Sequence, residues 1–127
     1  MRTRHAVIVA MAAGFGLGAV AIQSLHAQAK PPIYYVGEIE ITNPDGYAKD
    51  YLPKAKGLIE AAGGRYVAAG APTGIEGANP ATRAVVIVWD SIDAIMAWRN
   101  SEAFKVNRKI GEKYADFRAF TLNGVPQ

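Results

Sequence analysis

Arg83-Ala84-Val85-Val86-Ile87-Val88-Trp89 is the most informative stretch of this 127-residue chain. Every residue after Arg83 in it is apolar, and successive side chains of a strand point to opposite faces. The run is therefore apolar on both faces, which is typical of a central strand that is covered on each side. We expect the other strands and the helices to be arranged around residues 83–89.

Three further segments have the pattern of strands. Residues 65–68 begin one of them, and residues 116–123 alternate between two faces. A Gly/Pro-rich connection, residues 71–82, leads from the strand at 65 to the central strand. Residues 33–42 also alternate, with one face formed by Ile33, Tyr35, Gly37, Ile39 and Ile41 and the other by Tyr34, Val36, Glu38, Glu40 and Thr42.

Helical signals fill two of the gaps between these strands. Asn43 is a suitable N-cap before Pro44, and a helix follows as far as Gly63-Gly64, with Pro53 expected to kink or split it. Asp90-Ser91 and Asn100-Ser101 cap a second helical region. The order strand, helix, strand, strand, helix, strand predicts an α+β, ferredoxin-like βαββαβ fold, a four-stranded antiparallel sheet with two helices on one face.

The second face of this sheet has no helix to cover it. It would carry Tyr34, Val36 and half of the apolar central strand, a larger apolar patch than monomers usually expose. A twofold partner that lays its own sheet against this face is the simplest cover. We therefore expect a homodimer, joined through the open sheet face.

The first 29 residues have the order of a secretory signal peptide. Arg2 and Arg4 precede an uncharged apolar run, residues 6–22, and small residues at Ala27-Gln28-Ala29 follow. We expect cleavage after Ala29, a mature domain of residues 30–127 and a periplasmic or secreted location, with no membrane attachment after cleavage. The alternative is an uncleaved membrane anchor, because the apolar run approaches a bilayer-spanning length.

The amino-acid composition of the mature chain excludes several kinds of catalytic and metal-binding chemistry. Both histidines, His5 and His26, precede the expected cleavage site, and the chain has no cysteine. Thiolate nucleophiles, Cys/His metal sites, histidine-ligated haem and histidine general bases are therefore excluded, and we expect no metal and no cofactor. Loss of Arg2 and Arg4 lowers Lys plus Arg from 14 to 12 against 11 acids, a net charge of +1, which gives no reason to expect nucleic acid.

The order and spacing of several short pieces resemble an uncharacterised bacterial family, domain of unknown function 1330. The pieces are Thr42-Asn43-Pro44, Tyr47 and Tyr51, Gly63-Gly64-Arg65, Glu76-Gly77, Arg83, Asn100-Ser101-Glu102-Ala103-Phe104 and Ala115-Asp116-Phe117-Arg118. The resemblance implies the dimeric α/β-barrel form of the ferredoxin-like fold. It implies no function, since the family is unassigned and its wider superfamily includes monooxygenases, isomerases and haem enzymes.

Glu38 and Glu40 are the candidate catalytic residues. They lie two apart on one strand, so both carboxylates point to the face away from the aliphatic stripe. In a closed cleft, either carboxylate is suited to general acid/base chemistry. The alternative is structural: Arg118 on the last strand is expected beside the first strand, where it would pair with a glutamate.

Candidate ligand-binding residues are three arginines and three aromatic residues. Arg65, Arg83 and Arg118 start strands or lie within them, and a guanidinium in a cleft holds a small organic anion by paired hydrogen bonds. Tyr34, Tyr66 and Trp89 would line an aromatic pocket. The alternatives are strand-end cations in water and aromatic residues of the core. Tyr47 and Tyr51 are expected to pack the first helix, and Arg108 and Glu112 to pair on an exposed helix face.

Two functions of different classes are compatible with these residues. The first is a cofactor-independent enzyme that acts on a small organic molecule by carboxylate acid/base chemistry, with an arginine holding the anion. The second is a non-catalytic periplasmic protein that binds a small ligand in the same cleft. The connection at residues 71–82 would act as a lid in either case.

Overall fold

The computed structural model describes residues 30–127. Residues Pro31–Val125 form one compact unit, to which the following description applies. The predicted signal peptide, its cleavage site and the alternative membrane anchor lie outside the described residues. Within residues 30–127, no helix has the length and apolar character that a membrane span requires.

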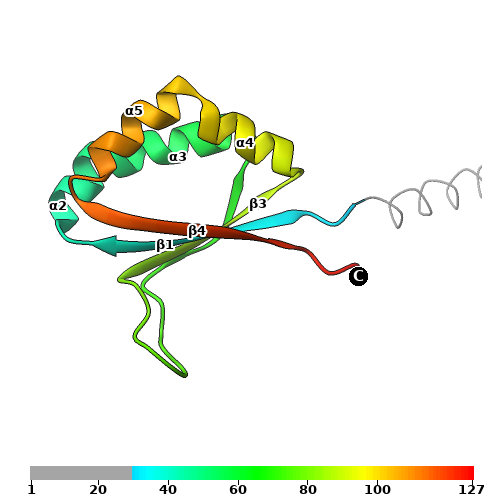
Figure 1. Cartoon of the computed structure of the whole chain (residues 1–127), viewed down its shortest axis with the longest axis horizontal. Coiled ribbons are helices and arrows are strands. Elements are labelled where there is room, and N and C mark those ends of the chain that lie inside the picture. The colour runs from blue at the N-terminus through cyan, green and yellow to red at the C-terminus, as the bar shows by residue number, and fades with distance from the viewer. Residues whose placement is uncertain (1–29) are drawn as a thin grey trace, which may run out of the picture. The chain divides into compact units, whose positions relative to one another are not determined.

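Four strands and two interrupted helical regions make up the unit (Figure 1). The strands are β1 (Ile33–Ile41), β2 (Arg65–Gly70), β3 (Arg83–Trp89) and β4 (Ala115–Asn123). The helical segments are α2 (Pro44–Gly46), the π-helical turn η1 (Tyr47–Tyr51), α3 (Leu52–Ala61), α4 (Ile92–Asn100) and α5 (Glu102–Gly111).

The sheet is antiparallel with the order β2-β3-β1-β4, so the apolar strand β3 and the alternating strand β1 lie at its centre. All the helical segments lie on one side of the sheet (Figure 1). This arrangement confirms the predicted ferredoxin-like α+β fold. Register then fixes the faces: Tyr35 is opposite Ile87 and Thr121, and these three residues point to the helix side together.

Pro53 splits the first helical region, as expected, and the structure shows how. A proline in a helix lacks the N–H group and collides with the carbonyl of the preceding turn. Pro53 lies at the start of α3, and the turn before it widens into η1, in which the Leu52 N–H reaches the Tyr47 carbonyl five residues earlier. Such π-helical turns are rare and often mark functional sites. Tyr47 and Tyr51, at the two ends of η1, are both buried.

The predicted caps are present. The Asn43 side chain accepts a hydrogen bond from the Gly46 N–H, and the Ser91 hydroxyl accepts one from the Ala94 N–H. Ser101 ends α4 and caps α5 through the Phe104 N–H. The second helical region is therefore two helices that meet at Ser101, and this bend carries both Trp98 and Phe104 onto the core.

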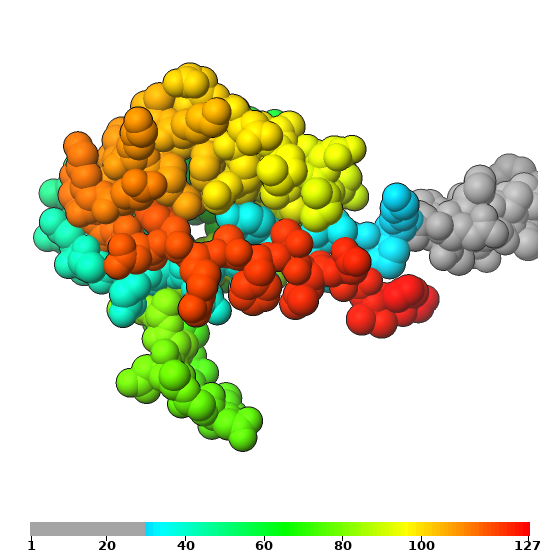
Figure 2. All heavy atoms as spheres, in the orientation of Figure 1, coloured from blue at the N-terminus to red at the C-terminus, as the bar shows by residue number. Residues whose placement is uncertain are grey.

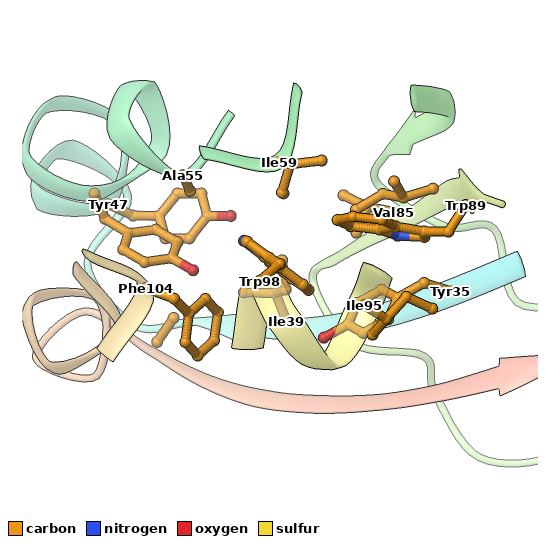
Figure 3. Close-up of a cluster of buried hydrophobic side chains, with 13 residues drawn as sticks. Tyr35, Ile39, Tyr47, Ala55, Ile59, Val85, Trp89, Ile95, Trp98 and Phe104 are labelled. Atoms are coloured by element: carbon orange, nitrogen blue, oxygen red, sulfur yellow. The ribbon is translucent and has the colours of Figure 1, made fainter. Parts of the chain in front are cut away.

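The core lies between the helices and the sheet (Figure 3). Ile87 and Trp89 on the helix side of β3 are its least exposed large side chains, at 1% each. The Trp98 ring centre lies 5.2 Å from that of Trp89, 5.4 Å from that of Tyr35 and 4.9 Å from that of Phe104. Aromatic rings at these separations attract one another beyond the burial of their area.

The opposite face of the sheet carries apolar side chains that nothing in the unit covers. Val67, Phe120 and Leu122 are 49%, 44% and 57% exposed. The connection between β2 and β3 projects from the sheet on the side away from the helices (Figure 1). Ile75 within this connection is 91% exposed. Both features belong to a surface that the unit alone leaves open.

We expect Ile87→Ala to lower the free energy of unfolding by about 2–5 kcal/mol, because it opens a cavity in a packed core. The same replacement at exposed Ile75 is the matched control and should change the value by less than about 0.5 kcal/mol. Urea unfolding followed by circular dichroism measures both. Equal effects at the two positions would contradict the core described above.

Candidate functional site

A cavity of about 140 Å³ lies between the sheet and the helices. We call it the helix-side cavity. Its floor is the helix side of β1 and β3, its roof is η1 and α3, and α4, α5 and β4 form the remaining wall. In Figure 2 the side of the molecule where α5 lies above β4 is in view, and a small opening separates the two. Its residues are Tyr35, Gly37, Ile39, Tyr47, Tyr51, Leu52, Ala55, Ile59, Tyr66, Val85, Ile87, Trp98, Arg99, Arg108, Phe117, Arg118 and Ala119.

Small residues on two neighbouring strands create this space. Gly37 of β1 pairs with Ala119 of β4 and with Val85 of β3. A Cβ atom on Gly37 would come within 2.9 Å of the Val85 side chain, so no larger residue fits there without a shift. Ala119 is exposed and also lines the cavity, which places it at the rim.

Three tyrosine side chains line the side of the cavity that faces η1 and β2. Burial raises the pKa of Tyr47 and of Tyr51, although Arg83 and Arg108 respectively offset part of the shift. Burial, together with the neighbouring Tyr47 and Tyr51, raises the pKa of Tyr66 to about 12. All three phenols therefore remain neutral hydrogen-bond donors at ordinary pH.

Two arginines from the helices complete the wall. Arg99 Nη1 donates to the Tyr35 hydroxyl at 3.1 Å, and Arg108 Nε donates to the Tyr51 hydroxyl at 3.2 Å. Both guanidinium groups also lie over the Phe104 ring, 4.5 Å and 4.7 Å from its centre. Within residues 30–127, neither arginine forms an ion pair. The cavity wall therefore contains three arginines and no carboxylate, and of these only Arg118, at the rim, has an acidic partner, Glu38.

The sheet separates the sequence-predicted site residues into two groups. Tyr66, Arg83 and Trp89 point to the helix side. Tyr66 lines the cavity, Arg83 lies beside Tyr47, and Trp89 is buried under Trp98 without reaching the cavity. Tyr34, Glu38, Glu40, Arg65 and Arg118 point to the open face, although Arg118 also reaches the cavity rim.

On the open face, both candidate glutamates have structural partners. Arg118 is opposite Glu38 in the register and binds one oxygen of its carboxylate through Nε, at 2.6 Å, and Nη2. This is the arginine–glutamate pair that strand order predicted. The Glu40 carboxylate accepts a hydrogen bond from the Thr82 N–H at 2.8 Å, which fixes the end of the 71–82 connection. No residue of that connection lines the helix-side cavity.

Sequence reasoning missed most of the cavity residues. The sequence pattern indicates only strand or core positions for Tyr35, Tyr47, Tyr51 and Trp98, and it predicts that Arg108 pairs with Glu112 on an exposed face. Arg108 turns inward to Tyr51 instead. The signal was present in the spacing, because Arg108 follows Phe104 by four residues and thus shares its apolar helix face.

Among the residues that the structure describes, no three His, Cys, Asp or Glu side chains are grouped closely enough to hold a metal ion. Tyrosine hydroxyls, guanidinium groups and an indole are the polar groups of the helix-side cavity. The guanidinium groups and the indole only donate hydrogen bonds, and the hydroxyls of Tyr35 and Tyr51 already accept one each from arginine and retain their own O–H donor. A ligand that complements these groups presents acceptors.

These features define a ferredoxin-like α+β domain with a small polar-and-aromatic cavity under its helices. The family model described as "Domain of unknown function (DUF1330)" matches residues 32–125. The chain belongs to this family, as the resemblance of its short sequence pieces implied. No curated protein matches the chain.

Solved structures share the fold at low sequence identity. The protein of unknown function RPA0582 from Rhodopseudomonas palustris has a TM-score of 0.64 and 15% identity, over 83% of this chain and 92% of that one. SnoaB, a cofactor-independent oxygenase from Streptomyces nogalater, has a TM-score of 0.57 and 11% identity, over 76% and 96%. A dimeric ferredoxin-like protein of unknown function from Thermobifida fusca has a TM-score of 0.55 and 20% identity, over 74% and 92%.

The raised pKa of Tyr66 predicts a pH dependence of stability. A group that is a weaker acid in the folded state stabilises the fold while it is protonated, and that contribution is lost as pH rises from its ordinary value of 10.0 to about 12. Over that range the urea midpoint of the wild type should fall more steeply than that of Tyr66→Phe. Between pH 7 and 9 the two slopes should agree. If the urea midpoints of the two proteins fall in parallel above pH 10, the pKa of Tyr66 is not raised by folding.

Proposed function

We propose that this protein is an exported homodimer that binds a small organic molecule in the helix-side cavity. The observation that carries the proposal is the cavity itself, which is lined by apolar and aromatic side chains with a few converging polar groups. Ligand sites in proteins usually have this composition. A cavity of about 150 Å³ is large enough to hold a benzene molecule, and the helix-side cavity is close to that size.

Dimerisation through the open face is supported by its exposed side chains. Phe120 and Leu122 of β4 and Val67 of β2 leave an apolar surface in water, which a second sheet would cover. Two copies related by a twofold axis present the same patch to each other. The Thermobifida fusca structure of similar fold is described as dimeric.

Turnover in the cavity is the second candidate function. Its support is the raised pKa of Tyr66, about 12, since a phenol that stays neutral is suited to donate a hydrogen bond to negative charge that develops on a bound molecule. SnoaB, which shares the fold, is described as a cofactor-independent oxygenase. Acid/base chemistry by Glu38 and Glu40 is less favoured, because both carboxylates are engaged on the other face of the sheet.

Native mass spectrometry of protein from the exported fraction tests the main proposal. We expect a dimer of chains beginning at Lys30 that carries an additional small mass. Ala119→Trp should remove that mass, because a large side chain at the rim closes the cavity. Turnover would appear as a difference between the mass of the bound molecule and that of the molecule released.

Two variants are the controls. Thr121→Trp places the same bulk on the same side of β4, two residues farther along and outside the cavity, and should keep the bound mass. Glu40→Gln changes the open face, where its carboxylate contacts only Thr82 and no cavity residue, and should also keep it. Loss of the mass in Thr121→Trp as well, or its retention in Ala119→Trp, would remove the support for ligand binding in this cavity.

The dimer interface predicts a separate response. Leu122→Glu puts a charge into the open face and should convert the dimer to monomer, since burying an unpaired carboxylate is costly. Val106→Glu on α5 is the matched control at 55% exposure and should remain dimeric. Light scattering after size-exclusion chromatography measures both masses. A Leu122→Glu dimer would show that the open face is not the interface.

A further inference from the structure

Arg99 and Arg108 of the helix-side cavity present a charge that nothing in the described residues neutralises. Each uses one nitrogen in the hydrogen bond to a tyrosine hydroxyl, whereas a guanidinium group carries five N–H donors. Both side chains are half-buried, so removal from water weakens the solvation of their charge. Two like charges held near the same Phe104 ring repel each other. An anion between them would relieve both costs.

Trp98 provides a second donor without a partner. Its side chain lines the cavity and is only 6% exposed, and its Nε1 atom is buried with no hydrogen-bond acceptor. Figure 3 shows the indole nitrogen at the end of the ring that is nearer to Tyr47 and farther from Trp89. Buried N–H groups nearly always have a partner. Trp89 Nε1 also has none, but Trp89 does not line the cavity, so of the two indoles only Trp98 is placed to donate to an acceptor that occupies the cavity.

The remaining walls restrict the shape of that occupant. Five other aromatic rings line the cavity, those of Tyr35, Tyr47, Tyr51, Tyr66 and Phe117. Aromatic walls favour a flat ligand, which can lie in stacked or edge-to-face contact with several rings at once. At about 140 Å³, the cavity has space for a single ring and a small substituent.

From these three observations we infer that the ligand of the helix-side cavity is a small planar organic anion, the size of one aromatic ring with one acidic group. The carboxylate or phenolate lies at the mouth against Arg99 and Arg108. An acceptor atom of the ligand takes the hydrogen bond from Trp98 Nε1. The ring lies among the tyrosines.

This inference rests on the proposed binding function and adds the class of ligand to it. A neutral ligand would leave both guanidinium groups without a counter-charge. Chloride or phosphate would satisfy the arginines without filling the aromatic space or reaching the Trp98 N–H. An ordered water molecule would accept the hydrogen bond from Trp98 but would neither neutralise the arginines nor fill the aromatic space. A planar organic anion satisfies all three requirements.

Titration of the purified exported protein with three probes tests the inference. Benzoate is planar and anionic, benzamide has nearly the same shape without the charge, and cyclohexanecarboxylate has the charge without the planar ring. Both tryptophans of the chain lie in the cluster beside the cavity, so intrinsic fluorescence reports on occupancy. We expect benzoate to bind at least about tenfold more tightly than either of the other probes.

Arginine variants locate the charge. Arg99→Gln and Arg108→Gln should each lower the benzoate affinity about tenfold or more and leave the benzamide affinity within about twofold. Arg65→Gln is the matched control, because Arg65 is an exposed arginine on the open face of β2. It should leave both affinities unchanged. Loss of benzamide binding together with benzoate binding in both variants would mean that these arginines hold the fold rather than the anion.

The two indole N–H signals of the nitrogen–proton NMR spectrum test the role of Trp98. Benzoate should move one of them strongly, and that signal should be the one missing from Trp98→Phe. The signal of Trp89, which does not line the cavity, should move little. If benzoate binds and neither signal moves, Trp98 does not contact the ligand and that part of the inference is wrong.

The outcomes separate this inference from the function on which it rests. Equal affinities for benzoate and benzamide, with both lost in Ala119→Trp, would keep the cavity as a binding site and overturn the anionic ligand. Binding of benzoate and cyclohexanecarboxylate alike would overturn the planar shape. No binding of any probe, together with no bound mass in the exported dimer, would overturn both the ligand class and the proposed function.

Discussion

The indole of Trp98 packs against rings from three other elements: Tyr35 of β1, Trp89 of β3 and Phe104 of α5. A sheet with helices on one side needs such a contact, because the α4–α5 layer is joined to it by the chain only through the ends of β3 and β4. The bend at Ser101 makes the contact geometrically possible, since it turns Trp98 and Phe104 toward the same point. Trp98 therefore joins α4 and α5 to the two central strands beside the cavity.

A core built only for stability would fill the space beside Trp98 with aliphatic side chains. This chain instead places tyrosine hydroxyls and guanidinium groups there, which must be removed from water and given partners. The hydrogen bonds from Arg99 to Tyr35 and from Arg108 to Tyr51 satisfy only some of the donors of these side chains. The Trp98 N–H has no partner in the described residues. Local departures of this kind from the rules of core packing are expected at functional sites rather than in a framework.

Sequence reasoning predicted the strands, the caps and the effect of Pro53 because each depends on a local pattern. As the alternative to a catalytic role, it also placed Arg118 beside the glutamates of the first strand, because the sheet order of the fold brings those two strands together, and the structure pairs Arg118 with Glu38. It did not find the cavity. A buried tyrosine on a helix face has the same spacing whether it fills the core or lines a space, and the space here depends on the absent side chain of Gly37 opposite Val85. Only three-dimensional packing distinguishes the two cases.

Strand β1 separates the two surfaces of this domain by the alternation of its side chains. Tyr35, Gly37 and Ile39 form the cavity floor, and Val36 and Glu38 between them belong to the open face. The two surfaces thus share a backbone and few side chains, and Arg118 is an exception because it pairs with Glu38 and also reaches the cavity rim. A partner that covers the open face would act on the cavity mainly through Arg118 and the position of β4. Occupancy of the cavity and association of two sheets are therefore separable by substitution everywhere except at this edge.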